Sequence, residues 1–163
     1  MSPVFHAIWG TAGADLPLPG ISSGGADAGD LQPLQLASVR DADPEGEGRE
    51  MPGEVPLAYD GNEATYWRTE RYATPDFGGL KAGVGLALEL QSPGVARRLD
   101  ITTTGTGGAF EVLAGPPSAD ARVVGRGTFE DGAQQVDLEP GAASGTYTFW
   151  ITDVPPNANC CAL

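Results

Sequence analysis

Apolar and polar residues alternate along this chain from residue 34 onwards, in short runs separated by glycine, proline and aspartate. In residues 84–90, Val84 and three leucines occupy every second position, and residues 34–40 alternate in the same way. Five more runs follow at short spacing, at residues 96–103, 109–114, 121–129, 134–138 and 146–154. Short alternating runs with turn residues between them are typical of antiparallel strands. The pattern therefore predicts an all-β sandwich or jelly roll.

The last of these strands has two different apolar faces. Tyr147, Phe149 and Ile151 fall on one face, which we predict to be the core face, and Trp150 falls on the other. Large exposed aromatic side chains are usually covered, which favours packing of Trp150 within the chain over contact with a partner. Two shorter predictions complete the fold: a helical turn at residues 55–59 and a hairpin turn at residues 105–108.

The domain organisation follows from where this alternation begins and ends. Residues 10–33 are rich in Gly, Ala, Asp, Pro and Ser without a hydrophobic period, which is the composition of a linker. We therefore predict a flexible segment at residues 1–33, a β-domain at 34–156 and a frayed tail at 157–163. The adjacent Cys160 and Cys161 lie in that tail, so they cannot form a disulfide framework for the core.

The net charge and the residue types disfavour several classes of function. The net charge is −13, which disfavours binding to nucleic acid or to an anionic lipid surface. The single histidine, His6, has no nearby cysteine or second histidine with which to form a general base or a zinc site. With no nucleophile and base in a recognisable arrangement, we expect a protein that is not an enzyme.

The most informative motif is the stretch from residue 57 to residue 69, in which an Asp60-Gly61-Asn62 corner precedes Trp67. Glycine accepts positive φ there, and the indole of Trp67 supplies a large area to bury. Asp60, Asn62 and Thr65 gather the oxygen ligands that Ca²⁺ prefers. The alternative is an Asx-type turn in which these oxygens bond nearby backbone N–H groups. A structural Ca²⁺ is thus the one cofactor that the sequence suggests.

The loop that follows Trp67 carries the candidate ligand-binding residues, which are Arg68, Arg71, Tyr72, Phe77 and Lys81. The two arginines form a fork suited to a carboxylate or a pyrophosphate, or they pair locally with Glu63, Glu70 or Asp76. The aromatic rings beside Arg71 and Lys81 are suited to stacking on a sugar. The alternative for Phe77 is that its ring fills the core.

These motifs resemble the discoidin or factor V/VIII type C superfamily, which includes family 32 carbohydrate-binding modules. The resemblance rests on an Ala-x-Asp-Gly-x-x-x-Thr-x-Trp element at residues 58–67, a Gly-x-x-Leu-x-Leu-x-Leu strand at residues 83–90 and a closing aliphatic-aromatic strand. Residues 67–72, 77–86 and 149–155 are more closely similar to the C-terminal extracytoplasmic domain of actinobacterial MviN-type (MurJ-like) flippase proteins. The resemblance covers about residues 34–156 and implies a galactose-binding-like β-sandwich.

The resemblance also implies a function and a location. It suggests an extracytoplasmic, non-catalytic binding or sensing module of a membrane protein of peptidoglycan biogenesis, joined to the membrane only through a tether. The expected ligand is a cell-wall glycan or a lipid-linked precursor held by the 66–83 loop. The alternative is a domain that docks another wall-synthesis protein, through the Trp150 face or the acidic loop at residues 41–53, without binding a glycan.

Overall fold

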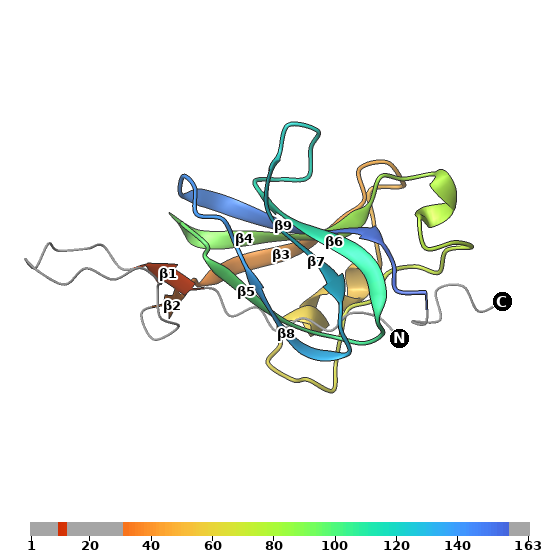
Figure 1. The fold of residues 1–163 in the computed structure, drawn as a ribbon, viewed down its shortest axis with the longest axis horizontal. Coiled ribbons are helices and arrows are strands. Elements are labelled where there is room, and N and C mark those ends of the chain that lie inside the picture. The colour runs from red at the N-terminus through yellow and green to blue at the C-terminus, as the bar shows by residue number, and fades with distance from the viewer. Residues whose placement is uncertain (1–9, 13–30, 157–163) are drawn as a thin grey trace, which may run out of the picture.

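A computed structural model describes residues 10–12 and 31–156, which form antiparallel β-sheets (Figure 1). The main sheet has five strands in the order β3-β4-β9-β6-β7, and a second sheet pairs β5 with β8. Its strands are β3 (Leu36–Ala42), β4 (Val84–Gly94), β9 (Ser144–Asp153), β6 (Gly107–Ala114) and β7 (Arg122–Phe129). The smaller sheet consists of β5 (Arg98–Thr103) and β8 (Gly132–Asp137). The predicted all-β sandwich is confirmed.

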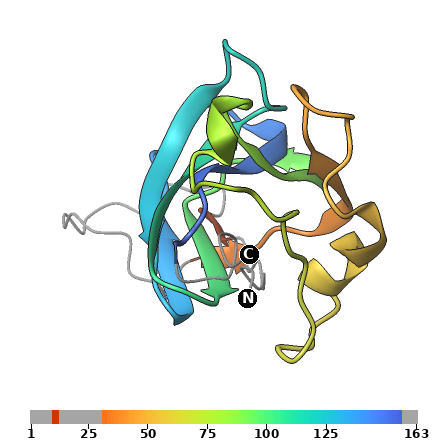
Figure 2. The same ribbon diagram turned by 90° about the vertical axis from the view of Figure 1, so that its right-hand side faces the viewer.

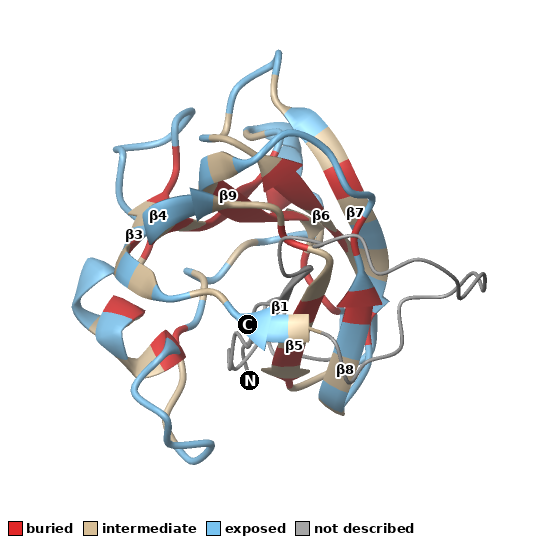
Figure 3. Cartoon of the chain, turned by 90° about the vertical axis from the view of Figure 1, so that its left-hand side faces the viewer, coloured by how far each residue is buried: buried red, intermediate tan, exposed pale blue. Residues whose placement is uncertain are grey.

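The core lies between these two sheets, where buried residues gather (Figure 3). Strand register aligns Leu86, Phe149 and Val112 across the main sheet, and all three are fully buried. From the opposite sheet, β5 and β8 contribute Leu99, Ile101 and Val136. Alternation along each strand thus places one apolar row on the inner face, as the sequence predicts.

Trp150 packs on the outer face of the main sheet, within its own chain. It is 9% exposed and forms a second cluster with Ala42 and Leu113. A Cβ atom at Gly83 would lie 2.5 Å from the indole, so the ring occupies space that only a glycine leaves open. The expectation that Trp150 is covered intramolecularly is confirmed, and a partner surface centred on this ring is not available.

The connection between β5 and β6 is not the hairpin turn predicted at residues 105–108, so that prediction is wrong. β5 pairs with β8, whereas β6 pairs with β7 and β9, so this segment crosses from one sheet to the other. Gly105, Gly107 and Gly108 all have positive φ, a conformation that glycine adopts without steric cost. The glycines do mark a turn, but their sequence does not reveal which strands it joins.

Two short strands occur where the sequence predicts only a linker. β1 (Gly10–Ala12) pairs antiparallel with β2 (Leu31–Pro33), although neither segment shows apolar alternation. The expectations for His6, for residues 13–30 and for the tail at 157–163 fall outside the described residues. Within the described part, no helix is long and apolar enough to cross a membrane.

Candidate functional site

The connection from β3 to β4, residues 43–83, forms one end of the sandwich (Figure 2). It contains the 3₁₀ helices η2 (Pro52–Ala58) and η3 (Phe77–Gly79), and η2 overlaps all but the last residue of the helical turn predicted at residues 55–59. Trp67 is fully buried within this connection, and its indole Nε1 donates a hydrogen bond to the carbonyl oxygen of Glu50 at 2.8 Å. The glycine corner ahead of it is also present, since Gly61 has a φ of 80°. The predicted role of Trp67 as an anchor is confirmed.

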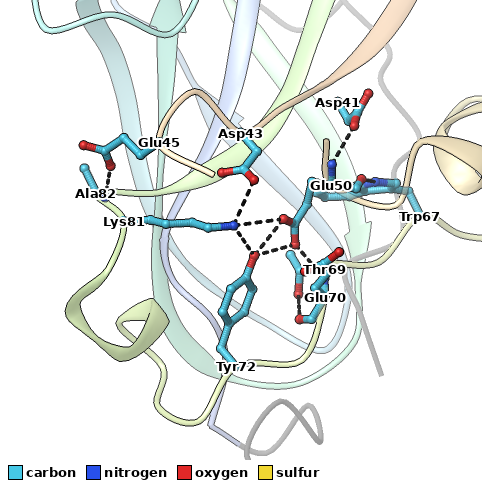
Figure 4. A network of polar contacts seen from close by, with 10 residues as sticks. All are labelled: Asp41, Asp43, Glu45, Glu50, Trp67, Thr69, Glu70, Tyr72, Lys81 and Ala82. Atoms are coloured by element: carbon cyan, nitrogen blue, oxygen red, sulfur yellow. Dashed lines mark hydrogen bonds and ion pairs between the residues drawn. The ribbon is translucent and has the colours of Figure 1, made fainter. Parts of the chain in front are cut away.

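Glu50 organises the residues around this anchor (Figure 4). Its side chain has no exposed surface. Its Oε1 accepts a hydrogen bond from the backbone N–H of Glu70 at 2.6 Å, and the Tyr72 hydroxyl lies 2.7 to 2.8 Å from the two carboxylate oxygens. The backbone N–H of Glu50 donates to Asp41 Oδ2 at 2.6 Å. One residue therefore connects the end of β3 with three points on the chain after residue 66.

Lys81 provides the positive charge for this cluster. Its Nζ donates to Asp43 Oδ2 at 2.9 Å and to the Tyr72 hydroxyl oxygen at 3.0 Å, and it lies 3.6 Å from Glu50 Oε2. The side chains of Lys81 and Asp43 are only 13% and 2% exposed. The only lysine of the chain is thus held by two buried carboxylates instead of facing a ligand.

Burial and charge shift the pKa values of three groups in the cluster. Burial raises the pKa of Glu50, and the hydrogen bonds from Tyr72 and Glu70 offset this effect only in part. Burial lowers the pKa of Lys81, but the hydrogen bond to Asp43 and the nearby carboxylates outweigh it, so that pKa lies above its ordinary value. Burial and the hydrogen bond to Glu50 raise the pKa of Tyr72. Lys81 and Tyr72 therefore remain protonated at neutral pH.

Phe77 lies in the core, which is the second of the two interpretations that its sequence position allows. It is 1% exposed and contacts Tyr72 edge-to-face, with ring centroids 4.8 Å apart. Phe77, Gly78 and Gly79 all have positive φ, and this sharp corner is followed by Leu80, which is 82% exposed. A sugar platform cannot use the ring of Phe77 in this conformation, whereas Leu80, which sequence reasoning missed, faces outward.

The two arginines of the predicted fork have different surroundings. Arg68 forms an ion pair with Glu54 of η2 at 2.8 Å, so none of the three acidic residues expected from the sequence is its partner. Arg71 is exposed and has no ion pair among the described residues. The charge of Arg71 is therefore not paired with a carboxylate of the described residues.

The predicted calcium ligands come together, but around hydrogen-bond donors. Asp60 accepts from the Asn62 N–H at 2.8 Å and from the Thr65 hydroxyl at 2.6 Å, and Asn62 Oδ1 accepts from the Ala64 N–H at 3.0 Å. The carbonyl oxygen of Asn62 accepts the same hydroxyl at 2.8 Å. Residues 10–12 and 31–156 contain no group of three or more His, Cys, Asp or Glu side chains that could hold a metal. These oxygens are arranged as an Asx turn, which is the alternative that the sequence allows.

The arrangement separates an inner cluster from an outer surface. Glu50, Asp43, Tyr72 and Lys81 bind one another, and they fix the loop from beneath. Neither Glu50 nor Asp43 is a predicted site residue, because both lie in an acidic run whose members look alike in sequence. The single lysine was the only sequence feature that could have indicated an ion pair with them. No protein-family model matches the sequence, and no solved structure matches the fold.

Proposed function

We propose that this chain is a non-catalytic binding module, and that its binding edge is the outer surface of the 66–83 loop. The observation that carries the proposal is the contrast between the two sides of this loop. The inner side is fixed by the fully buried Glu50, while the outer side exposes Arg68, Arg71 and Leu80. A loop held rigidly on a β-scaffold loses little conformational entropy when it binds, which favours a recognition surface.

The proposed ligand is a cell-wall glycan or a lipid-linked wall precursor, and the proposed setting is the extracytoplasmic part of a membrane protein. This part of the proposal rests on the resemblance of residues 58–67 and 83–90 to discoidin-like domains and of residues 67–72, 77–86 and 149–155 to MviN-type domains. Arg71 offers planar donors for a ligand carboxylate or phosphate. Because Phe77 is buried and Tyr72 belongs to the inner cluster, aromatic stacking on a sugar falls to the half-buried Tyr66.

The test is a binding titration of soluble muropeptides and wall polysaccharides against the purified chain. Arg71→Ala and Leu80→Ser change exposed side chains only, so the fold is expected to remain intact. Both are expected to weaken binding, Arg71→Ala by about tenfold because a charge-assisted hydrogen bond contributes about 1.5 kcal/mol or more. Arg40→Gln is the matched control, since Arg40 is exposed on β3 and pairs with Glu89. No binding by the wild-type chain, or equal losses in all three variants, would contradict the glycan assignment.

A second candidate is a protein-docking domain, favoured by the exposure of Leu80. A single leucine at the tip of a rigid corner is suited to an apolar pocket of a partner protein. In that case the glycans do not bind, and Leu80→Ser abolishes co-purification with one wall-synthesis protein while Arg40→Gln preserves it. The same variants therefore separate the two candidates.

A further inference from the structure

A pocket lies at the opposite end of the sandwich from the 66–83 loop. It has a volume of about 250 Å³ and lies between the end of β6, the start of β7 and the connection from β8 to β9. Its apolar wall consists of Ala114, Val124 and the ring of Tyr147. Its polar lining comes from Arg122, Glu139 and Ser144. It combines an apolar surface with a few polar groups, as ligand pockets commonly do, and its volume suits a small ligand.

The wall of this pocket is firmly positioned. Tyr147 is 2% exposed, and its hydroxyl donates to the carbonyl oxygen of Gly94 at 2.9 Å and accepts from the Ala96 N–H at 3.0 Å. Those bonds hold the polar end of the side chain, which leaves the ring as apolar wall. On the other side, the Glu139 backbone N–H donates to the Val124 carbonyl at 2.7 Å. Residues 141–143, which also line the pocket, are Gly, Ala and Ala.

Among the described residues of the lining, Arg122 is the one with a positive charge. Its side chain is 53% exposed, and its Nη2 lies 3.7 Å from Glu139 Oε2, beyond hydrogen-bond distance. Glu139 is itself 78% exposed, so solvent weakens this pair. By contrast, Arg126 on the same strand donates to Glu111 at 2.9 Å. The guanidinium of Arg122 thus retains its donors for a planar anion.

We propose that this pocket binds a small organic acid, with its carboxylate paired to Arg122 and its apolar body against Val124 and Tyr147. A carboxylate accepts two parallel N–H bonds from a guanidinium, a geometry that Glu139 does not achieve from its present position. Binding therefore replaces the Glu139 contact instead of adding to it. The site is independent of the proposed function of the 66–83 loop.

The probe is butyrate, titrated into the ¹⁵N-labelled chain and followed by amide and Arg Nε chemical shifts, with butyramide as the uncharged comparison. Saturable shifts are expected at residues 122–124 and 141–144, with a Kd of about 1 mM, as befits so small a ligand. Butyramide is expected to bind at least about tenfold more weakly, because it lacks the charge that pairs with Arg122.

Four variants test the geometry. Arg122→Gln is expected to weaken butyrate binding about tenfold, whereas Arg126→Gln leaves it unchanged. Glu139→Gln strengthens binding about two- to fivefold, because it removes the competing carboxylate. Gly141→Ala keeps the charge but places a Cβ 2.1 Å from the present position of Arg122 Nη1, so the guanidinium must move and binding weakens. The proposal is overturned by absent or unsaturable shifts, by shifts confined to the 66–83 loop, or by equal affinity in the Arg122→Gln and wild-type chains.

Discussion

The hydroxyl of Tyr72 lies 2.7 and 2.8 Å from the two carboxylate oxygens of Glu50, a side chain without exposed surface. A buried carboxylate that loses a hydrogen-bond donor retains the full cost of its desolvation. Tyr72 and Glu50 are far apart in sequence but lie together under the 66–83 loop, so this contact fastens the loop to the chain that follows β3. The variant Tyr72→Phe removes this hydrogen bond.

Tyr72→Phe deletes only the hydroxyl and keeps the ring against Phe77. We expect the free energy of unfolding to fall by about 1.5 to 3 kcal/mol, the range for a hydrogen bond to a charged group. Urea denaturation followed by tryptophan fluorescence measures it. The control is Tyr59→Phe, which changes a tyrosine that is 42% exposed and should leave stability within about 0.5 kcal/mol. Equal stability of both variants would show that the Glu50 contact is not formed.

Lys81→Met tests the charge that holds Asp43 and Glu50. Removing one partner of a buried ion pair leaves uncompensated carboxylates, which costs about 3 to 5 kcal/mol. The comparison is Arg40→Met, which breaks the exposed pair with Glu89 and is expected to cost at most about 1 kcal/mol. Thermal or urea unfolding of both variants measures the difference. If Lys81→Met is as mild as Arg40→Met, the lysine faces solvent.

The pH dependence of stability follows from the raised pKa of Glu50. Because its folded pKa lies above its unfolded value of 4.5, protonation favours the folded state. The stability that this group contributes is therefore fully present below pH 4.5 and is lost as the pH rises through the folded pKa. Glu50→Gln removes this titration while keeping a carbonyl acceptor.

The measurement is the free energy of unfolding of wild type and Glu50→Gln between pH 4 and pH 8, at about one-unit intervals. Subtracting one curve from the other cancels the remaining carboxylates. We expect the stability of wild type relative to the variant to fall as the pH rises. A rising difference would mean that the hydrogen bonds and Lys81 outweigh burial at this site.

The Asp60–Thr65 turn is expected to hold without a metal. Its oxygens accept hydrogen bonds from Asn62, Ala64 and Thr65, so EDTA and millimolar CaCl₂ should leave the Tm unchanged. Thr65→Val removes the hydroxyl donor and should cost about 1 kcal/mol. A rise in Tm with Ca²⁺ that is abolished in Asp60→Asn would instead establish the calcium site.

Gly83 tests the packing of the outer face. A Cβ at this position would lie 2.5 Å from the Trp150 ring and 2.6 Å from the carbonyl oxygen of Ile151, so Gly83→Ala forces the strands or the indole to shift. Overpacking of this kind costs about 1 to 3 kcal/mol. Gly53→Ala is the control, because nothing lies within 4 Å of its added Cβ. Near-UV circular dichroism, to which Trp150 contributes, together with urea unfolding checks both variants.

The alternation of apolar and polar residues was sufficient to predict the strands, but not the residues at which they begin and end. Period-two alternation located all seven strands of the sandwich and the core row of β9, because a strand with one buried face must place apolar residues at every second position. β3 begins two residues later than residue 34 and β4 continues to Gly94, because strand ends depend on the neighbouring strand that supplies the hydrogen bonds.

The candidate site was only partly accessible to such reasoning. The sequence singled out Tyr72, Phe77 and Lys81 by residue type, but residue type does not tell whether a side chain points inward or outward. Glu50 and Asp43 belong to a run of acidic residues in which Glu45 and Glu47 are exposed, and only the folded chain places Glu50 and Asp43 beside the single lysine. A contact between residues 31 or more positions apart leaves no local periodicity by which it could be found.

The sequence alone determined that this chain forms a β-sandwich with an indole anchored behind an Asp-Gly corner, because both depend on interactions between near neighbours and on the burial of alternating apolar residues. Only the tertiary structure decided which glycine turn crosses between the sheets, which charged groups are buried, and which side chains of the 66–83 loop remain outside. Burial and pairing of charges depend on what other segments bring to the same place, and this information resides in the packing of the whole chain.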